Sequence, residues 1–440
     1  MKSTGTGRPG CGVYLCVGVA IIVAVGGCAV TPEWPQWGGP NRDFVVKTHG
    51  LADSWPEGGP ERLWERELGD GYSSILVDHG TLYTMYGAEG AECVVALDAE
   101  TGHTVWEHRD PVLFKGTEFG PGPHSTPLIV GNRLFAVGAN GVFRCFDKRT
   151  GEVQWQQDLA KEYGAPTLHF GKSHSPTAYK NLVILPVDRT RSDEQEGSPE
   201  GEGDKSEAEA TTVGQSLMAF DQATGQVVWK KQDYPIDYSS PILIEFDGQD
   251  QLVLILRKEI IAVDPSNGEL LWHHPFSPVP MENITTPLWN GEDLLLFSAA
   301  YNSGTRVLEL IKKDGKTVPK ELWFSRKLRI MHGNAVRVGD YVYGSSGDFG
   351  TQLLTCLNIR TGKVVWRQRG FKKGNLVFGD GKLVILDEDG RLALATPTPD
   401  GLTVHAECTV TGYQSWTVPT LVGKTLYVRD RKHIKALDLG

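Results

Sequence analysis

One phrase recurs along this 440-residue chain, and its regular return constrains the fold more than any other feature. Each copy begins with a small residue, an apolar residue and an Asp or Asn. Three residues follow, the last of which is Thr or Asn, and then a Gly. Three further residues lead to a Trp. The copies occupy residues 96–106, 145–155, 219–229, 262–272 and 356–366. A repeat returning every 20 to 50 residues or so indicates a solenoid, a propeller or a linear array.

The chemistry of the phrase predicts a hairpin. An Asp or Asn side-chain oxygen accepts a hydrogen bond from the backbone N–H two residues on, and the Gly is free to take positive φ. The Trp then begins the returning strand, where its ring is expected to be buried between neighbouring sheets. The predicted structural residues of these copies are Asp98, Gly102, Trp106, Asp147, Gly151, Trp155, Asp221, Gly225, Trp229, Asp264, Gly268, Trp272, Gly362 and Trp366.

Degenerate copies complete the count. Lys313-Asp314-Gly315 leads to Trp323, and residues 395–401 keep the small residue and the Gly, which places His405 where a Trp is expected. A last copy, ending in Asp438, lies at the C-terminus, where no Trp follows it. Trp64, near the start, has no copy before it. We therefore expect the first strand to complete the last sheet and close a circle.

These repeats predict an all-β fold, an eight-bladed β-propeller of four-stranded antiparallel blades over residues 60–440. Short strands such as those at 133–137 and 142–146 agree with about 40 residues per blade. The alternative, a solenoid with repeats of similar length, needs helical periodicity, and no convincing amphipathic helix is present.

The N-terminus indicates export. Basic Lys2 and Arg8 precede an apolar run at 12–25, which is shorter than the roughly 20 residues of a membrane-spanning helix. We predict a signal peptide at 1–27. The ending Val25-Gly26-Gly27-Cys28 resembles a bacterial lipobox, which implies lipid attachment at Cys28, and Ala29 after it implies the outer membrane. A secretory signal cut slightly later, or a true anchor, is the alternative. Residues 28–59 are expected to form a tether and lead-in.

Residues 189–212 contain no large apolar side chain, so they cannot bury enough surface to offset chain entropy, and we expect a disordered acidic loop. An acidic functional tether is the alternative. The net charge of −10 argues against a nucleic-acid partner. Cys93, Cys145, Cys356 and Cys408 match no zinc spacing, and Cys145 and Cys356 stand where other copies have Ala, as expected of core thiols.

The starts of the innermost strands are expected to converge at one mouth of a central channel. The residues there include Tyr72, His124, His174, Tyr238 and His332, which form a candidate ligand site for a transition metal, a sugar or a peptide. The alternative is that these groups bind strand ends and channel water.

His124 stands three residues before the next Pro in the sequence, whereas His174 stands two residues before its next Pro. Because alternate residues of a strand point to opposite faces, one of these two side chains can point away from the channel mouth. We therefore expect His124 and His332 to face the channel mouth together more readily than all three histidines. No catalytic triad or HExxH spacing is present, so no catalytic residue and no metal ligand are predicted.

The phrase, together with the opening residues 34–43, resembles the PQQ-like propeller repeat family over residues 60–440. The family includes BamB, a non-catalytic outer-membrane lipoprotein. That resemblance implies an exported lipoprotein facing the periplasm, whose propeller is a scaffold for envelope proteins or peptides, with strand addition as one binding mode. Its contact with the membrane would be the lipid anchor.

The same family includes quinoprotein alcohol dehydrogenases, so the alternative is an oxidoreductase dependent on PQQ or a metal. Those enzymes use calcium, an Asp base and a disulfide between adjacent cysteines. This sequence has no adjacent cysteines, and its eight blades leave no long insertion for a substrate pocket. We therefore expect no cofactor; PQQ with calcium belongs only to the alternative.

Overall fold

The computed structural model describes residues 1–2, 4–5, 33–116, 119–165, 168–187, 215–276, 283–301, 303–347, 352–412 and 414–440. The chain divides into two compact units, residues 1–31 and 32–440. Most of the predicted signal peptide, Cys28 and the whole of the 189–212 insertion lie outside the described residues. Within the described ranges, no helix has the length and apolar character needed to cross a membrane.

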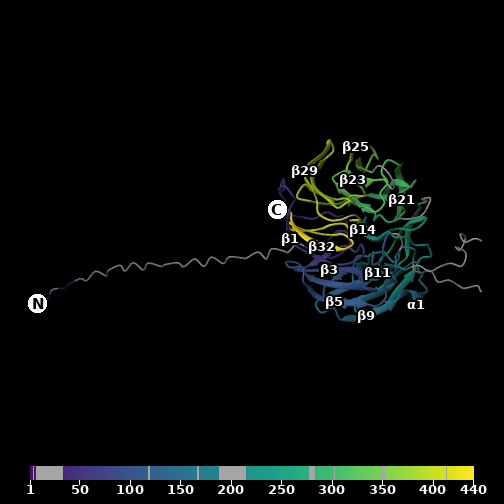
Figure 1. Ribbon diagram of the computed structural model, residues 1–440, viewed down its shortest axis with the longest axis horizontal. Helices are drawn as coiled ribbons and strands as arrows, with labels where there is room; N and C mark the ends of the chain where they lie inside the picture. Colours follow the sequence, from purple (N-terminus) through teal and green to yellow (C-terminus); the bar gives the residue numbers. More distant parts are fainter. Residues whose placement is uncertain are drawn as a thin grey trace, which may run out of the picture. The chain divides into compact units, whose positions relative to one another are not determined.

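The second unit consists of eight four-stranded antiparallel sheets that follow one another around a ring, which confirms the predicted propeller (Figure 1). Blade 1 contains β2 (Leu76–Asp78), β3 (Thr81–Ala88), β4 (Ala91–Asp98) and β5 (Thr104–Asp110). Blade 2 contains β6 (Leu128–Val130), β7 (Arg133–Val137), β8 (Val142–Asp147) and β9 (Val153–Asp158). Blade 3 contains β10 (Thr177–Tyr179), β11 (Leu182–Pro186), β12 (Leu217–Asp221) and β13 (Val227–Lys231). Blade 4 contains β14 (Ile242–Phe246), β15 (Gln249–Ile255), β16 (Glu259–Val263) and β17 (Leu270–Pro275).

The other half of the ring repeats this plan. Blade 5 contains β18 (Leu288–Trp289), β19 (Leu294–Ala299), β20 (Gly304–Lys313) and β21 (Lys316–Ser325). Blade 6 contains β22 (Ala335–Val338), β23 (Tyr341–Ser346), β24 (Leu353–Asn358) and β25 (Val364–Arg369). Blade 7 contains β26 (Asn375–Gly379), β27 (Lys382–Leu386), β28 (Arg391–Thr398) and β29 (Gly401–Thr409). Blade 8 contains β30 (Thr420–Val422), β31 (Thr425–Arg429), β32 (His433–Asp438) and β1 (Glu61–Glu67).

The outermost strand of each blade is its least buried strand. In blade 1, every residue of β2 and nearly every residue of β3 and β4 is buried, whereas β5 is exposed or half-buried throughout. The core therefore lies between the faces of neighbouring blades. One short helix, α1 (Leu159–Tyr163), follows β9 and is capped by Asp158, whose side chain accepts a hydrogen bond from Lys161 N.

The two ends of the chain close the ring. β1 pairs antiparallel with β32, and Arg62 lies opposite Leu437 and Trp64 opposite Ala436. The sheet order β1-β32-β31-β30 makes the N-terminal strand the outermost strand of the last blade, as predicted. The ring is thus held together by backbone hydrogen bonds between its first and last strands, in addition to side-chain packing.

The repeated phrase builds the joint between neighbouring blades. Asp98 Oδ1 accepts a hydrogen bond from Thr101 N at 2.8 Å and one from Glu100 N at 3.2 Å, as the hairpin predicts. Gly102 has φ of 72°, and a Cβ there would lie 2.7 Å from the ring of Trp64 on the preceding blade. The Trp64 Nε1–H donates to Ala99 O at 2.9 Å. Each hairpin therefore receives the ring of the previous blade's Trp directly on its Gly.

The same joint recurs around the ring. Gly151, Gly225, Gly268 and Gly362 have φ between 68° and 75°, and each faces the Trp ring of the blade before it, namely Trp106, Trp155, Trp229 and Trp323. The indole N–H of Trp106, Trp155 and Trp323 donates to the residue after the hairpin Asp or Asn, respectively Lys148, Gln222 and Ile359.

Two details differ from the sequence expectation. Trp229 and Trp272 are buried, but Trp64, Trp106, Trp155, Trp323 and Trp366 are only half-buried, although all seven lie on the outermost strands of their blades. His405 does not take the place of a Trp. A bulge in β29 leaves His405 unpaired between Val404 and Ala406, and it is Ala406 that lies opposite Leu394 in the register that other blades give to Trp.

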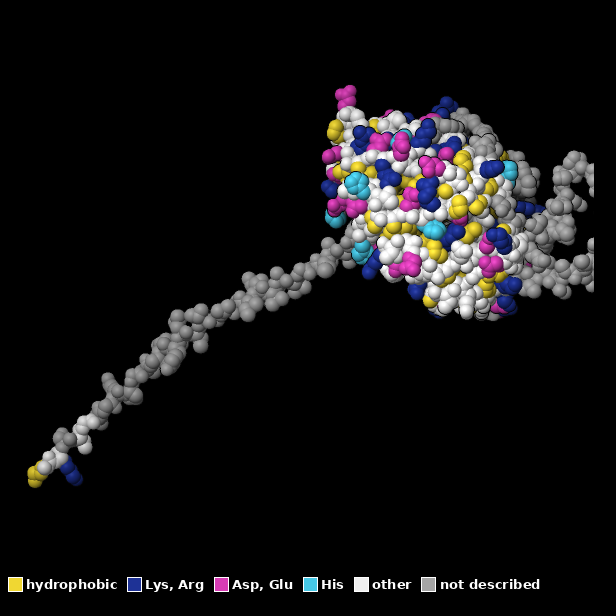
Figure 2. All heavy atoms as spheres, turned by 60° about the horizontal axis from the view of Figure 1, so that its bottom comes forward, with side chains coloured by type: hydrophobic (Ala, Val, Ile, Leu, Met, Phe, Trp, Pro, Cys, Tyr) yellow, Lys and Arg dark blue, Asp and Glu magenta, His cyan; other side chains and the backbone are white. Residues whose placement is uncertain are grey.

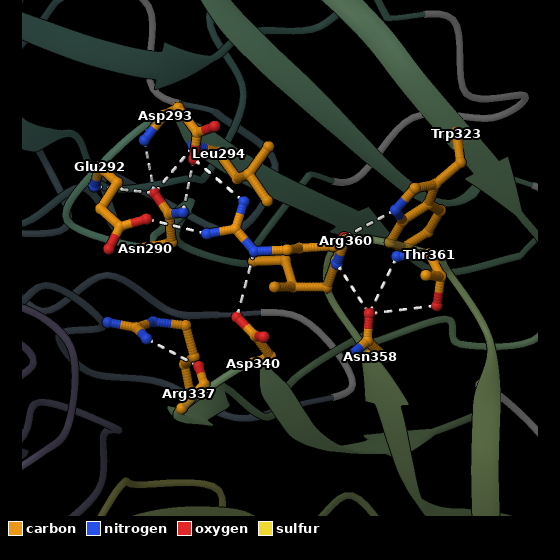
Figure 3. Close-up of polar contacts among 12 residues, drawn as sticks. Asn290, Glu292, Asp293, Leu294, Trp323, Arg337, Asp340, Asn358, Arg360 and Thr361 are labelled. Atoms are coloured by element: carbon orange, nitrogen blue, oxygen red, sulfur yellow. Dashed lines mark hydrogen bonds and ion pairs between the residues drawn. The ribbon is translucent and has the colours of Figure 1, made fainter.

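An ion-pair cluster reinforces the joint between blades 5 and 6 (Figure 3). Arg360, in the hairpin after β24, contacts Glu292 at 2.8 Å and Asp293 at 3.6 Å, both in the turn before β19, and also Asp340 at 3.3 Å. These groups are largely exposed, so each pair contributes little, on the order of 0–1 kcal/mol. Trp323 on β21 also joins these two blades, because its Nε1–H donates to Ile359 O at 2.7 Å and its ring lies on Gly362.

The cysteines behave as the repeat predicts. Cys145 and Cys356 are fully buried opposite Trp155 and Trp366, where other blades have Ala, and burial raises the pKa of both thiols. Cys93 is buried and Cys408 half-buried, and none of the four forms a disulfide. These thiols are therefore packing residues.

Candidate functional site: a cavity in the central channel

The lead-in segment is not a free tether, because residues 34–52 pack against the inner strands of several blades. Trp34 forms an antiparallel bridge with Val77 of blade 1, and Pro35 O accepts from Ile129 N of blade 2 at 2.8 Å. Val46 N donates to Phe378 O of blade 7 at 2.9 Å, and Ala52 N donates to Leu439 O at 2.7 Å. The segment therefore spans the channel from one side of the ring to the other.

Arg42 holds this segment in place. Its guanidinium is buried and donates to Pro241 O at 3.0 Å, to Pro176 O and to Gln36 Oε1 at 3.0 Å. Pro176 and Pro241 directly precede the inner strands of blades 3 and 4. Burial lowers the pKa of Arg42 to about 9, which still leaves it charged at neutral pH. One side chain thus joins the lead-in to two blades.

A cavity of about 140 Å³ lies in the channel beside this segment. Seven blades and the lead-in contribute to its wall. Its lining residues are Trp37, Tyr72, Phe119, His124, Phe170, Ser173, Ser175, Tyr238, Ser240, Ile284, His332 and Trp416. Trp37 comes from the lead-in and is fixed by its Nε1–H, which donates to Thr286 Oγ1 at 2.8 Å.

Aromatic rings pack in an unbroken group around the cavity. Trp416 stacks on His332 at 4.5 Å between ring centroids and on Tyr72 at 5.4 Å. Phe119 lies edge-on to Trp416 at 5.5 Å and contacts Phe170 at 5.5 Å. The Tyr72 hydroxyl donates to Phe119 O at 2.6 Å, which ties the group to the backbone. Such pairs prefer offset or edge-to-face geometry, as found here.

The structure brings four of the five candidate residues to the cavity wall: Tyr72, His124, Tyr238 and His332. Burial lowers the pKa of His124 to about 4 and that of His332 to about 3, so both imidazoles are neutral at physiological pH. A second cause for His332 is the nearby charge of Lys373. Both histidines are accordingly neutral hydrogen-bonding groups on the wall.

His174 is absent from the cavity lining. It is buried, its Nε2 contacts Asp237 O, and burial lowers its pKa to about 3. Ser173 lines the cavity instead. Ser173 stands three residues before Pro176, the spacing that His124 has before Pro127, so strand alternation accounts for the exchange.

Sequence reasoning missed Trp37, Phe119, Phe170, Ser173 and Trp416. A signal existed for Trp416, which directly precedes Thr417-Val418-Pro419, the same Thr-x-Pro pattern found at the other strand starts. Trp37 lies outside the repeat, and Phe119 and Phe170 lie in connections between blades, so no periodicity pointed to them.

The cavity does not suit calcium-bound PQQ. Calcium needs six to eight oxygen ligands, with carboxylates prominent among them, and the lining residues that the structure describes include no Asp, Glu, Asn or Gln. A space of about 140 Å³ is also close to that of cavities that hold a single benzene ring, whereas PQQ has three fused rings. The residues present therefore do not fit that cofactor.

One group of metal-binding residue types lies elsewhere. Ligand atoms of Glu33, Asp78 and His79 lie within 4.8 Å of one another. Asp78 is already ion-paired with Lys148, whose ammonium lies between blades 1 and 2. A cation would compete with that ammonium, so the cluster is better described as a hydrogen-bonded corner of blade 1.

The closed ring and its Asp-Gly-Trp joints define a PQQ-like β-propeller. The chain belongs to the family described as outer membrane protein assembly factor BamB, whose sequence profile matches residues 56–192, 187–368 and 305–439. Together these matches cover nearly the whole ring.

Individual relatives agree with this family. The chain is 26% identical over 181 residues to the outer membrane protein assembly factor BamB of Alteromonas naphthalenivorans, covering 38% of this chain and 40% of that one. It is 22% identical over 328 residues to BamB of Yersinia pestis, covering 70% and 72%. Among solved structures, quinohemoprotein alcohol dehydrogenase from Comamonas testosteroni is similar with a TM-score of 0.64 at 13% identity, covering 93% and 81%. That last likeness shows the fold alone.

Proposed function

We propose that this protein is a protein-binding scaffold of the bacterial envelope that takes part in outer-membrane protein assembly. Membership of the BamB family supports the class of function. The observation that carries the proposal is an aromatic and arginine cluster on blade 5, made by exposed Phe324 on β21, exposed Arg326 directly after that strand and half-buried Arg306 on β20. It lies on the outer side of the ring, away from the channel.

Phe324 is the centre of this cluster. Among the phenylalanines that the structure describes, it is the only one exposed, at 40%. The Arg306 and Arg326 guanidiniums each lie 5.4 Å from its ring centroid, and Leu322 beside it is exposed too. Aromatic and arginine side chains are enriched at protein interfaces and dominate their energetics. This arrangement favours a protein partner over a small ligand.

The outer strands favour side-chain docking over full strand addition. Each carries a bulge beside its Trp register, and the bulged residue is exposed and apolar in Leu63, Val105, Val228, Leu322 and Val365. A bulge bends an edge strand and interrupts its row of free backbone groups. Over the face shown in Figure 2, acidic and basic side chains are interspersed, with apolar ones among them.

Site-specific photocrosslinking tests the proposal. A photoreactive amino acid at Phe324 should crosslink to an envelope protein in intact cells, and Phe324→Ala should reduce co-purification of that protein. The matched control is Val105 on β5 of blade 1, which is more exposed at 55% but is aliphatic and so offers no aromatic ring to an arginine. Equal crosslinking at both positions, or none at either, would count against the assigned face.

The proposed location is the periplasmic face of the outer membrane, with lipid attached at Cys28. The apolar run at 12–25, followed by the small residues Gly26 and Gly27 directly before Cys28, supports this location. Cys28→Ser should abolish labelling with a radioactive fatty acid and release the protein into the soluble periplasmic fraction. Membrane association that survives this change points to an uncleaved anchor.

The quinone-dependent alternative has weaker support. A solved quinohemoprotein dehydrogenase shares the fold, but the described residues of the cavity wall include no carboxylate for calcium. Incubation of the protein with PQQ and calcium, followed by a dye-linked alcohol oxidation assay, separates the two functions. The scaffold proposal expects no dye reduction above the protein-free background.

A further inference from the structure

We propose that the channel cavity binds a single uncharged aromatic ring carrying one hydrogen-bond donor, as phenol and indole do. This site is distinct from the Phe324 cluster and does not depend on the scaffold function. Four features of the cavity support it: its volume, its walls, its lack of charge and its unpaired polar atoms.

The volume sets the size of the ligand. The cavity measures about 140 Å³, and an engineered protein cavity of roughly 150 Å³ holds benzene. One six-membered ring, or the slightly larger indole with minor side-chain adjustment, therefore fills it. Trp37 from the lead-in completes the wall, and its indole is held by Thr286.

The walls favour a flat ring. Trp416 stacks on Tyr72 with an interplanar angle of 26° and on His332 with an angle of 15°. Phe170 and Tyr238 meet edge to face at 61° on the other part of the wall. The wall therefore presents both ring faces and ring edges to a bound ring. Aromatic pairs in these geometries are more stable than burial of their surface alone would make them.

The described residues of the lining carry no charge at neutral pH. None of them is Asp, Glu, Lys or Arg, and burial keeps the pKa of His124 and His332 at about 4 and about 3. Lys373 lies 4.8 Å from the Trp416 ring centroid but is paired with Glu388 at 3.0 Å. An ionic ligand would lose its hydration without a counter-charge, so an uncharged one is favoured.

Unpaired polar atoms on lining residues favour a ligand with a donor. Within the described part of the chain, Ser173 Oγ, His124 Nε2 and His332 Nδ1 are buried and have no hydrogen-bond partner. A neutral imidazole nitrogen without a proton, or a serine oxygen, accepts a hydrogen bond from O–H or N–H. Leaving such groups unpaired is costly, so a phenol or an indole should bind better than benzene.

Calorimetric titration of the full-length protein tests the preference. Phenol and indole are expected to bind with one site per chain and at least about tenfold more tightly than cyclohexanol, which has a hydroxyl and similar size but no aromatic ring. Equal affinity for phenol and cyclohexanol, or no binding of phenol and indole, would overturn the proposal without any variant.

A cavity-filling variant then locates the site. Ser173→Leu places a larger side chain on the wall and removes no hydrogen bond, because Ser173 Oγ makes none. It should weaken phenol binding by about tenfold or more. Ser54→Leu, at an exposed position outside the channel, is the matched control and should leave binding unchanged. If Ser173→Leu binds phenol as the parent does and has the same melting temperature, the ligand binds elsewhere and the proposed site is wrong.

Two natural sources share this chemistry: a free small compound and an aromatic side chain of a bound peptide. N-acetyl-tyrosinamide distinguishes them. If it binds as tightly as phenol, the mouth admits a peptide backbone and the source is a protein side chain. If phenol binds alone, the source is a free compound. Crosslinking at Phe324 reports on the scaffold function separately, so either proposal can fail while the other stands.

Discussion

The joints between blades and the wall of the channel are built by opposite strategies. At a joint, one solution is repeated: a Trp ring rests on the positive-φ Gly of the next hairpin, as Trp64 does on Gly102. In the channel, seven blades contribute side chains that follow no common pattern, and a segment outside the repeat, centred on Trp37 and Arg42, joins them. The joint is therefore a repeated structural module, whereas the channel wall does not repeat from blade to blade.

The comparison teaches where specificity is stored. Five copies of one phrase can hold a ring together because every joint needs the same contact. A binding site needs different groups at different angles, so it draws on positions that the phrase leaves free, such as His124, Ser173 and Trp416. The following predictions test this division, beginning with the change that should matter most.

Removing the closing strand should have the largest effect. Deletion of residues 433–440 takes away β32, which lies between β31 and β1, and leaves β1 without a partner. The whole ring should lose its cooperative melting transition, measured by circular dichroism. Removal of exposed Gly440 alone is the control and should shift the transition little. A truncated chain that melts like the parent would show that the ring does not need this closure.

A buried joint Trp should matter next. Trp229 is 7% exposed, and Trp229→Ala should cost about 3–5 kcal/mol through loss of a buried ring. Trp366 is only half-buried, so Trp366→Ala should cost about half as much. Denaturant melts of the two variants measure the difference. Similar costs would mean that burial does not control the strength of a joint.

Arg42→Met tests the channel side of the comparison. Loss of the guanidinium leaves Pro176 O and Pro241 O without this donor, at a cost of about 2–4 kcal/mol. Hydrogen exchange should rise first in the lead-in, at residues 34–46, and not in the outer strands. Arg66→Met, which removes exposed contacts at a joint, is the control and should cost about 1 kcal/mol or less. Uniform loss of protection around the ring would contradict a local role for Arg42.

A pH change should affect the channel more than the joints. The pKa of His174 falls from 6.5 to about 3 on folding, chiefly through burial and then through the charge of Lys172. The unfolded chain therefore binds a proton that the folded chain does not, and stability is lost as the pH falls below about 6.5.

Between pH 7.5 and 5, His174 should account for about 2 kcal/mol of that loss. Urea melts of His174→Gln over this interval should show a smaller loss than the parent by about that amount. His103→Gln, at an exposed hairpin of a joint, is the control. If both variants keep the parent's pH dependence, His174 is not buried in its neutral form.

The joints were largely predictable from sequence because they are local. The Asp and Gly of each hairpin and the Trp four residues later fix a contact whose geometry repeats, so the fold, the blade number and the pairing of β1 with β32 all followed from the spacing. The degree of Trp burial did not follow, because all seven Trp residues lie on outermost strands and the repeat does not distinguish their surroundings. The position of His405 did not follow either. The other outer strands carry the same bulge, but β28 and β29 continue to pair as far as Thr398 and Gly401, so His405 falls on the bulge and not on the Trp position.

The channel was predictable only where the repeat reaches it. Tyr72, His124, Tyr238 and His332 precede inner strands, and counting back from Pro indicated that His124 and His174 differ in direction. The path of residues 34–52 could not be read from the sequence, because nothing in that segment repeats and its hydrogen-bond partners lie on seven different blades. Its contacts are set by tertiary packing alone.

The pairing of β1 with β32 also imposes an order of events on biosynthesis. β1 is the first strand of the ring to be synthesised, and its partner β32 is the last. Until β32 arrives, β1 presents unpaired backbone groups on both edges, and no blade sequence between them can close the circle. The ring therefore cannot close before β32 has been synthesised, and the chain is exposed to aggregation for as long as these two strands remain apart.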